Sequence, residues 1–113
     1  MRLFKWLEGR QKGGYKKMLL WYCNEFIPFD LWLLKYPEGS KIGWHTDEVE
    51  GKKNYRVNFR LKSAKSGGKF LSRHDPIFSK WGLTVFQPDK NRHMVTKVTE
   101  GTRFVLSFGF TKD

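Results

Sequence analysis

Short runs of aromatic and branched apolar residues recur along this chain, and turn residues separate them at fairly regular intervals. Tyr55–Leu61 is the clearest run, because apolar residues at 57, 59 and 61 alternate with polar residues at 56, 58 and 60. About eight such runs predict strands: Met18–Tyr22, Phe29–Tyr36, Ile42–Thr46, Tyr55–Leu61, Lys69–Leu71, Leu83–Phe86, Met94–Val98 and Arg103–Phe110. Many short strands at regular spacing favour an all-β sandwich or jelly roll over an α/β fold.

Helical content is expected to be minimal. Met1–Leu7 could form a short helical turn, and apolar content alone would allow a helix through Tyr15–Phe26, although short aromatic runs favour strands there. Lys62–Gly68 is predicted as a basic turn, and the stretch that ends at Lys80 as a loop. Residues 1–113 are expected to form a single domain, in which five Trp, four Tyr and ten Phe supply the core.

The chain is strongly basic, with 22 Lys and Arg against 11 Asp and Glu, a net charge of +11. This excess predicts attraction to polyanions, or high solubility alone. Cys23 is the only cysteine, which excludes an intrachain disulfide and favours a reducing compartment. The first residues do not resemble a signal peptide, and no apolar stretch approaches about 18 residues. We therefore expect a soluble, intracellular (cytoplasmic) protein without membrane contact.

His45, Asp47 and His93 are the candidate metal ligands. His45 and Asp47 lie two positions apart near a predicted strand, so their side chains would share a face. His93 can supply a third ligand if its strand lies beside the first. Two imidazoles and one carboxylate suit Fe(II) with one face open for chemistry, and would also accept Mn, Ni, Co or Zn. Arg103, ten residues after His93, adds a fixed cation that can hold a dicarboxylate.

The same residues also allow simpler interpretations. His45 and Asp47 could form a surface hydrogen-bonded pair, with His93 an ordinary loop residue, because short motifs often occur by chance. His74 and Asp75 are a rival pair of ligands, but adjacent residues of a strand point to opposite faces, and Asp75 before a proline suits a turn.

An ordered series of motifs runs from about residue 34 to residue 110. The series consists of Leu34–Gly39, Gly43–Asp47, Tyr55–Asn58, Gly67–Phe70, Leu83–Phe86, His93–Val98, Gly101–Arg103 and Phe108. In this order it resembles the Fe(II)/2-oxoglutarate-dependent dioxygenases, prolyl 4-hydroxylase-like branch. The resemblance implies a double-stranded β-helix, which is a cupin-like jelly roll. The chain is short for this family and nearly lacks the helices that usually precede the barrel.

The resemblance also implies roles for single residues. His45, Asp47 and His93 match the iron ligands, and together with Arg103 they would form the catalytic centre. Arg103 matches the residue that pairs with the distal carboxylate of 2-oxoglutarate. Tyr36 matches a tyrosine that lines the cosubstrate pocket.

Further candidates surround the expected pocket. Arg56 matches a strand arginine near the substrate mouth. Alternation puts Asn58 and Arg60 on the same face as Arg56, where Asn58 could bind the cosubstrate and Arg60 the substrate. A solvated outer face is the alternative for both arginines. Trp44 could flank the substrate or pack in the core.

The resemblance implies an enzyme that couples the oxidative decarboxylation of 2-oxoglutarate by O2 to hydroxylation of a C–H bond. Fe(II) would be the cofactor, and ascorbate the reductant in assays. The substrate stays open between a protein or peptide side chain and a nucleobase, for which the charge of +11 and the many aromatic residues give some support. The alternative from another class is a non-catalytic, basic β-sandwich that binds nucleic acid and retains a vestigial metal site.

Overall fold

The computed structural model of the chain describes residues 3–9, 13–25, 28–47 and 51–112. These residues form twelve strands and no helix. The strands are β1 (Trp6–Glu8), β2 (Lys16–Cys23), β3 (Phe29–Tyr36), β4 (Ile42–His45), β5 (Lys53–Lys62), β6 (Ser66–Gly67), β7 (Phe70–Ser72), β8 (Phe78–Lys80), β9 (Leu83–Phe86), β10 (His93–Val95), β11 (Val98–Glu100) and β12 (Arg103–Lys112). No described segment forms a helix with the length and apolarity that crossing a membrane requires.

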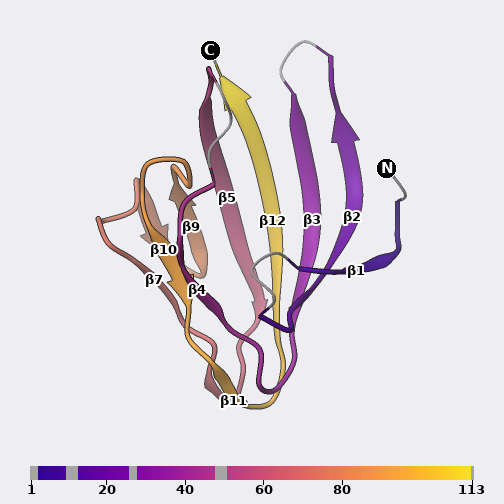
Figure 1. The fold of residues 1–113 in the computed structure, drawn as a ribbon, viewed down its shortest axis with the longest axis vertical. Coiled ribbons are helices and arrows are strands. Elements are labelled where there is room, and N and C mark those ends of the chain that lie inside the picture. Colours follow the sequence, from indigo (N-terminus) through magenta and orange to yellow (C-terminus); the bar gives the residue numbers. More distant parts are fainter. Residues whose placement is uncertain (1–2, 10–12, 26–27, 48–50, 113) are drawn as a thin grey trace.

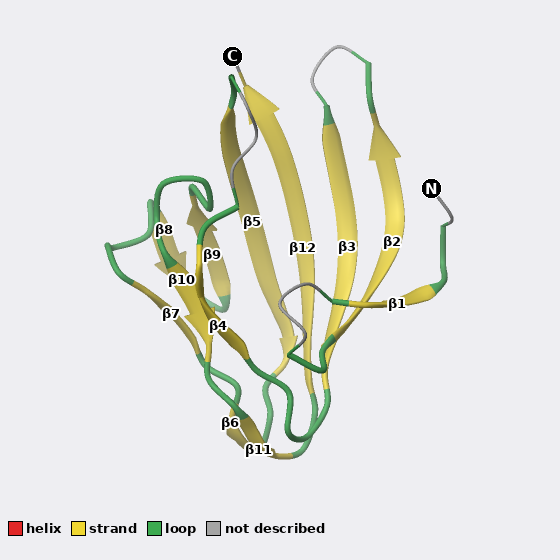
Figure 2. Ribbon diagram, in the orientation of Figure 1, coloured by secondary structure: helices red, strands yellow, loops and turns green. Residues whose placement is uncertain are grey.

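The strands form a large sheet, a small sheet and a short ribbon, all antiparallel. The large sheet has seven strands in the order β1-β2-β3-β12-β5-β9-β8, the small sheet three in the order β4-β10-β7, and the ribbon pairs β11 with β6. The strands of the large sheet fan out from the end at which β6 and β11 lie (Figures 1 and 2). The two sheets contact each other through Phe70 of β7 and Phe86 of β9, whose ring centres are 4.9 Å apart.

The predicted all-β jelly roll is confirmed. Its centre is β12, the last strand in sequence, which pairs with β3 on one side and β5 on the other. Strands that are distant in sequence are therefore neighbours in the sheet, as in a double-stranded β-helix. β2 occupies most of the segment for which a helix had also been considered, so the preference for strands there is confirmed as far as residue 25.

Several local predictions are wrong. The helical turn at Met1–Leu7 is not formed in its described part, where β1 begins at residue 6. The predicted turn Lys62–Gly68 contains β6, and the predicted loop before Lys80 contains β8. The predicted strand Met94–Val98 is two strands, β10 and β11, in different sheets. These strands have two or three residues each, too few for a local pattern. β6, β10 and β11 form by pairing with distant segments, and β8 by a tight hairpin with β9.

The polar face of β5 points into the molecule. Asn58 and Arg60 pair with Ser107 and Val105 of β12, which are both 1% exposed, so their side chains share the buried face of the sheet. The apolar face of β5 points outwards, and Phe59 is 43% exposed. The alternation was predicted correctly, and the face of the arginines is not a solvated outer face, although Arg60 itself is exposed in the cavity lining. The reason is a polar cavity between the sheets, which is described below.

The outer face of the large sheet is apolar. Leu106 of β12 pairs with Leu33 and Phe59, and Phe108 pairs with Leu31. Trp21, beside Leu31 on β2, is 57% exposed. No helix in the described part of the chain covers this face, in keeping with the expectation that the helices before the barrel are nearly absent.

A small apolar core supports the end of the cavity. It consists of Tyr15, Tyr36, Ile42, Val95, Val98 and Val105. The paired glycines of the 67–70 motif allow β6 to approach this core closely. Gly67 has φ +76°, and a Cβ there would lie 2.1 Å from the carbonyl oxygen of Lys97. Gly68 has φ +64°, and a Cβ there would lie 2.8 Å from Val98 and 3.4 Å from Arg103.

Candidate metal centre and cosubstrate cavity

Two neighbouring strands of the small sheet bring the two histidines together. His45 is the last residue of β4 and His93 the first of β10, and the antiparallel register places them directly opposite each other. Their ring centres are 4.3 Å apart. The expectation that His93 comes from a strand beside the first is therefore met by the geometry.

Asp47 reaches the same place from a loop. β4 ends at His45, so the shared face of a strand is not what brings the two residues together, and that part of the prediction is wrong. Instead, the Asp47 N–H donates to the carbonyl of Pro88 at 2.7 Å, and the Asn54 side chain donates to the Asp47 carbonyl at 3.2 Å. These bonds attach the loop to β5 and to the segment before His93.

The three side chains form a compact set of donor atoms. Asp47 Oδ2 lies 3.7 Å from His45 Nε2 and 3.5 Å from His93 Nε2. One possible ligand atom from each of the three residues lies within 4.8 Å of the other two. Such separations exceed a good hydrogen bond, but a single ion can bridge them.

Backbone carbonyls orient both imidazoles. His45 Nδ1 lies 2.7 Å from the carbonyl oxygen of Gly43, and His93 Nδ1 lies 2.9 Å from that of Asn91. A carbonyl only accepts, so each Nδ1 carries a proton that it donates to the carbonyl, and Nε2 is the nitrogen of each ring that faces Asp47. Metal-binding histidines are held in the same way by their second nitrogen.

The electrostatics favour an ionised carboxylate at the centre of this cluster. Burial by itself would raise the pKa of Asp47, but interactions with the imidazoles of His45 and His93 outweigh it and hold that pKa well below its usual range. Two neutral nitrogens and one carboxylate oxygen are a donor set that fits Fe(II) and other divalent transition metals. Metal binding by these residues remains a prediction.

Aromatic rings enclose the inner side of His93, which is 6% exposed. The Phe86 ring meets it edge-on with ring centres 5.0 Å apart, and the Phe70 ring lies 5.9 Å from it. Phe70 is also part of the wall of a cavity between the two sheets, so one ring connects the candidate metal centre to that cavity.

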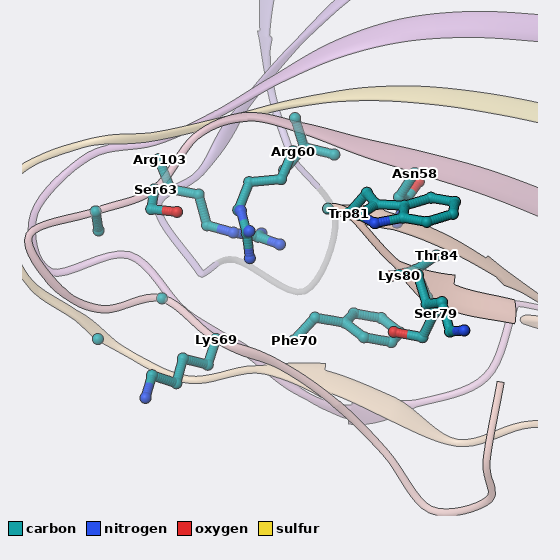
Figure 3. Close-up of a pocket in the computed structure, with 15 residues that line it drawn as sticks. Asn58, Arg60, Ser63, Lys69, Phe70, Ser79, Lys80, Trp81, Thr84 and Arg103 are labelled. Carbon is teal, nitrogen blue, oxygen red and sulfur yellow. The ribbon is translucent and has the colours of Figure 1, made fainter.

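The cavity has a volume of about 450 Å³ (Figure 3). Its polar and charged lining comes from the large sheet and from segments that follow β5 and β6, and the small sheet adds the Phe70 ring. The polar and charged residues are Asn58, Arg60, Ser63, Lys69, Ser79, Lys80, Thr84 and Arg103. Four of these side chains are cationic and none is a carboxylate. Such a lining suits an anionic ligand.

Arg103 is the buried cation of this cavity, with 7% of its surface exposed. Its guanidinium carbon lies 5.0 Å from the ring centre of Tyr36. Burial lowers the pKa of Arg103, and the nearby charge of Arg60 adds to this effect while Tyr36 opposes it. Within the described ranges Arg103 forms no ion pair with a carboxylate, and a buried charge is costly until an anion joins it.

Tyr36 contacts the guanidinium of Arg103 but is not part of the cavity lining. It is 3% exposed and stacks on Tyr15 with ring centres 5.2 Å apart. Burial raises the pKa of Tyr36 further above its usual value, although Arg103 opposes that rise. The phenol therefore stays protonated, and its predicted contact with a cosubstrate remains a prediction.

Arg56 is held away from the cavity by its own partners. It donates to Asp30 Oδ1 and to Ser107 Oγ, both at 2.8 Å, and Ser107 Oγ donates to Asn58 Oδ1 at 2.6 Å. Gly109 makes room for the guanidinium, because a Cβ there would lie 2.1 Å from it. Arg56 thus orients Asn58, which does line the cavity, whereas the structure does not bring Arg56 itself to the cavity wall.

We expect the Arg56→Ala substitution to lower stability rather than cosubstrate affinity. Asp30 and Arg56 are partly exposed, so a double-mutant cycle with Asp30→Ala should show a coupling of about 1–2 kcal/mol. Urea unfolding of the four proteins would measure this coupling. Arg60→Ala, an exposed arginine of the same strand face, is the control and should not couple to Asp30. Additive effects of Arg56→Ala and Asp30→Ala would contradict the assignment.

Two other candidates lie apart from the cluster. Trp44 is 48% exposed and lines a second hollow of about 280 Å³ with Arg73 and Arg92, so it is not a core residue. The His74 backbone is held by the side chain of Asn91 at 3.0 Å. Neither His74 nor its neighbour Asp75 belongs to the metal-binding group found among the described residues.

The structure adds residues that sequence reasoning missed. Phe70 and Trp81 line the cavity with Lys69 and Lys80, although none of them was a candidate. Phe70 lay in a quoted motif and could have been considered. Trp81 stands before a glycine, between the loop predicted to end at Lys80 and the predicted strand Leu83–Phe86. Its only signal is that a tryptophan is unusual in such a connection.

No family model and no curated protein matches the sequence. Among solved structures, the chain is similar to an oxidoreductase of the 2OG-Fe(II) oxygenase family from Burkholderia pseudomallei, with a TM-score of 0.59 and 22% identity. The match covers 91% of this chain and 46% of that chain, so this chain spans less than half the length of that protein. An RmlC-like cupin from Desulfovibrio desulfuricans has a TM-score of 0.45 and 17% identity over 76% of both chains.

The likeness to the oxygenase-family structure shows the fold alone. The oxygenase-family structure shares the jelly roll with this chain, at an identity that carries neither activity nor branch. The prolyl 4-hydroxylase-like branch therefore stays a prediction from the motif series.

Proposed function

We propose that this protein is an Fe(II)- and 2-oxoglutarate-dependent dioxygenase that hydroxylates a C–H bond. The observation that supports the proposal is that a candidate metal site and an anion-binding cavity lie next to each other. A two-histidine, one-carboxylate cluster lies on one side of Phe70. On the other lies a cavity with a buried arginine that has no carboxylate partner in the described part of the chain. The shared fold with an oxygenase-family protein supports the proposal.

In this proposal His45, Asp47 and His93 hold the metal. The carbonyls of Gly43 and Asn91 keep both imidazoles turned towards it. Bound Fe(II) would supply the centre at which O2 and 2-oxoglutarate react, so that one oxygen atom enters succinate as CO2 leaves and the other enters the substrate as a hydroxyl group.

Arg103 would bind the distal carboxylate of 2-oxoglutarate. A guanidinium fork matches a carboxylate in a bidentate way, and the low exposure of Arg103 strengthens that contact by excluding water. The Tyr36 ring holds the guanidinium of Arg103 in place, and Asn58, whose side-chain oxygen already accepts from Ser107, lines the cavity and would donate its N–H groups to the ligand. Phe86 and Val105, 2% and 1% exposed, keep the surroundings dry.

Succinate formation tests this function without knowledge of the substrate. The purified protein, supplied with Fe(II), ascorbate and 2-oxoglutarate in air, should form succinate slowly, because uncoupled turnover needs no prime substrate. Zn(II) binds the same donors but has no redox chemistry, so Zn(II)-loaded protein is the matched control and should form none. If Fe(II) and 2-oxoglutarate both bind and succinate stays at the level of the Zn(II) control, the non-catalytic module with a vestigial metal site is the better description.

A further inference from the structure

Trp81 occupies a turn position that does not suit its side chain. Trp81 and Gly82 form the two-residue loop between β8 and β9, because Lys80 pairs with Leu83. Both loop residues have positive φ, 55° and 77°, as in a type I′ turn, for which Asn-Gly is the preferred sequence. Bulky residues are rare and strained at such angles, and strain of this kind gathers at functional sites.

Core packing does not account for this tryptophan, whose surface is 85% exposed. Its only described ring partner is Phe78, at a ring-centre distance of 6.3 Å. Figure 3 shows the indole of Trp81 and the ring of Phe70 on opposite sides of the cavity, with the guanidinium groups of Arg60 and Arg103 towards one end. A planar group between the two rings would lie against Phe70, whose ring centre is itself 5.9 Å from that of His93.

The walls around this slot are cationic. Arg60, Lys69 and Lys80 are exposed cations of the cavity lining, in addition to the buried Arg103, and no carboxylate lines it. The whole chain carries +11. A ligand that fits must combine a flat ring with negative charge outside it, a combination that nucleic acids have at every residue.

We propose that the prime substrate is a single-stranded nucleic acid, one base of which enters the cavity and stacks on Trp81 while its phosphates lie on Lys80, Lys69 and Arg60. This inference rests on the proposed function and names the substrate class for the same site. A single strand is required, because a paired and stacked base cannot enter a concave cavity without leaving the duplex. An acidic peptide offers charge without a ring at each residue and is the competing occupant.

The test measures binding of a short fluorescein-labelled single strand of mixed sequence by fluorescence anisotropy at about 0.1 M salt. Trp81→Asn is the decisive variant, since asparagine suits the turn and should keep or raise the melting temperature. We expect it to weaken binding about 5- to 150-fold, the range that corresponds to stacking of one base at about 1–3 kcal/mol. Trp81→Phe should retain most of the affinity, because it keeps an aromatic face.

Two controls separate stacking from general effects. Trp21→Ala removes an indole that is 57% exposed on the outer face of the large sheet, and should leave binding unchanged. Lys80→Ala should weaken binding of all sequences alike and lower the slope of affinity against salt by about one, as loss of a phosphate contact does. A labelled poly-glutamate peptide should bind more weakly than the single strand.

Equal affinity of Trp81→Asn and the wild type would overturn the inference, and so would binding of poly-glutamate as tight as that of the nucleic acid. The binding test uses metal-free protein without 2-oxoglutarate, so its result is independent of turnover. Trp81-dependent binding without succinate formation would refute the proposed function alone. Succinate formation with Trp81-independent binding would refute the substrate class alone.

Discussion

Asp47→Ala is expected to reduce succinate formation to background and to weaken metal binding by at least about 100-fold. Asp47 supplies the only carboxylate of the cluster and its only negative charge. Loss of residues that merely support a ligand already lowers metal affinity or activity by about 10- to 100-fold, so loss of a ligand should cost more. Titration with Mn(II) or anaerobic Fe(II), followed by calorimetry, measures the first effect, and succinate formation the second.

The variant should remain folded. The hydrogen bonds that fix this loop use the backbone N–H and carbonyl of Asp47, which alanine retains. Thermal unfolding followed by circular dichroism would verify this. Asp75→Ala is the matched control, because it removes an exposed carboxylate outside the cluster and should leave metal binding and turnover unchanged. Full turnover in Asp47→Ala would rule out the assigned ligand.

Arg103→Met should raise the KM for 2-oxoglutarate by roughly 30-fold to several thousand-fold while metal affinity stays the same. Removing one partner of a buried, hydrogen-bonded charge pair costs about 2–5 kcal/mol, and each 1.4 kcal/mol is a factor of ten. Methionine is an unbranched, flexible side chain that fills much of the volume of the arginine stem, so the fold should persist. Steady-state succinate formation at saturating Fe(II) provides the measurement.

Arg103→Lys tests whether cosubstrate binding depends on the planar guanidinium geometry or only on the positive charge. Lysine keeps a positive charge but not the planar, bidentate geometry, so its KM should fall between those of the wild type and Arg103→Met. Lys69→Ala, an exposed cation of the same cavity, is the control and should change the KM little. An unchanged KM in Arg103→Met would show that another residue binds the distal carboxylate of 2-oxoglutarate. Arg60 would then be the next cation to test.

The candidate metal ligands could be predicted, because their residue types and spacing indicate a metal site. His45, Asp47 and His93 were predicted to meet, and they do, but the assumed cause was incomplete because β4 ends before Asp47. A loop held by Pro88 and Asn54 does the positioning. Backbone hydrogen bonds between distant segments leave no trace in local periodicity, so this part could not be predicted.

Phe70 and Trp81 illustrate a different gap. Both became part of the cavity only because β7 and the β8–β9 turn approach each other across the two sheets. An aromatic residue in a run of short strands is usually core, and the sign of φ at Trp81 is not visible in composition. Only coordinates separate a ring in a cavity wall from a ring in the core.

Alternation along Tyr55–Leu61 shows where sequence information ends. A strand places successive side chains on opposite faces, so the sequence alone determined that the arginines at 56 and 60 and the asparagine between them share one face. Likewise, the order of the motifs determined a jelly roll, and the donor types determined which metals would suit.

Tertiary structure alone decided that the polar face of this strand points inwards and that Asp30 and Ser107 accept hydrogen bonds from Arg56. It also decided that Arg103 is buried without a carboxylate partner among the described residues. The physical reason is the range of the interactions. Side-chain direction within a strand follows from local backbone geometry, whereas the choice of the buried face and of each charge's neighbours depends on the pairing of segments tens of residues apart.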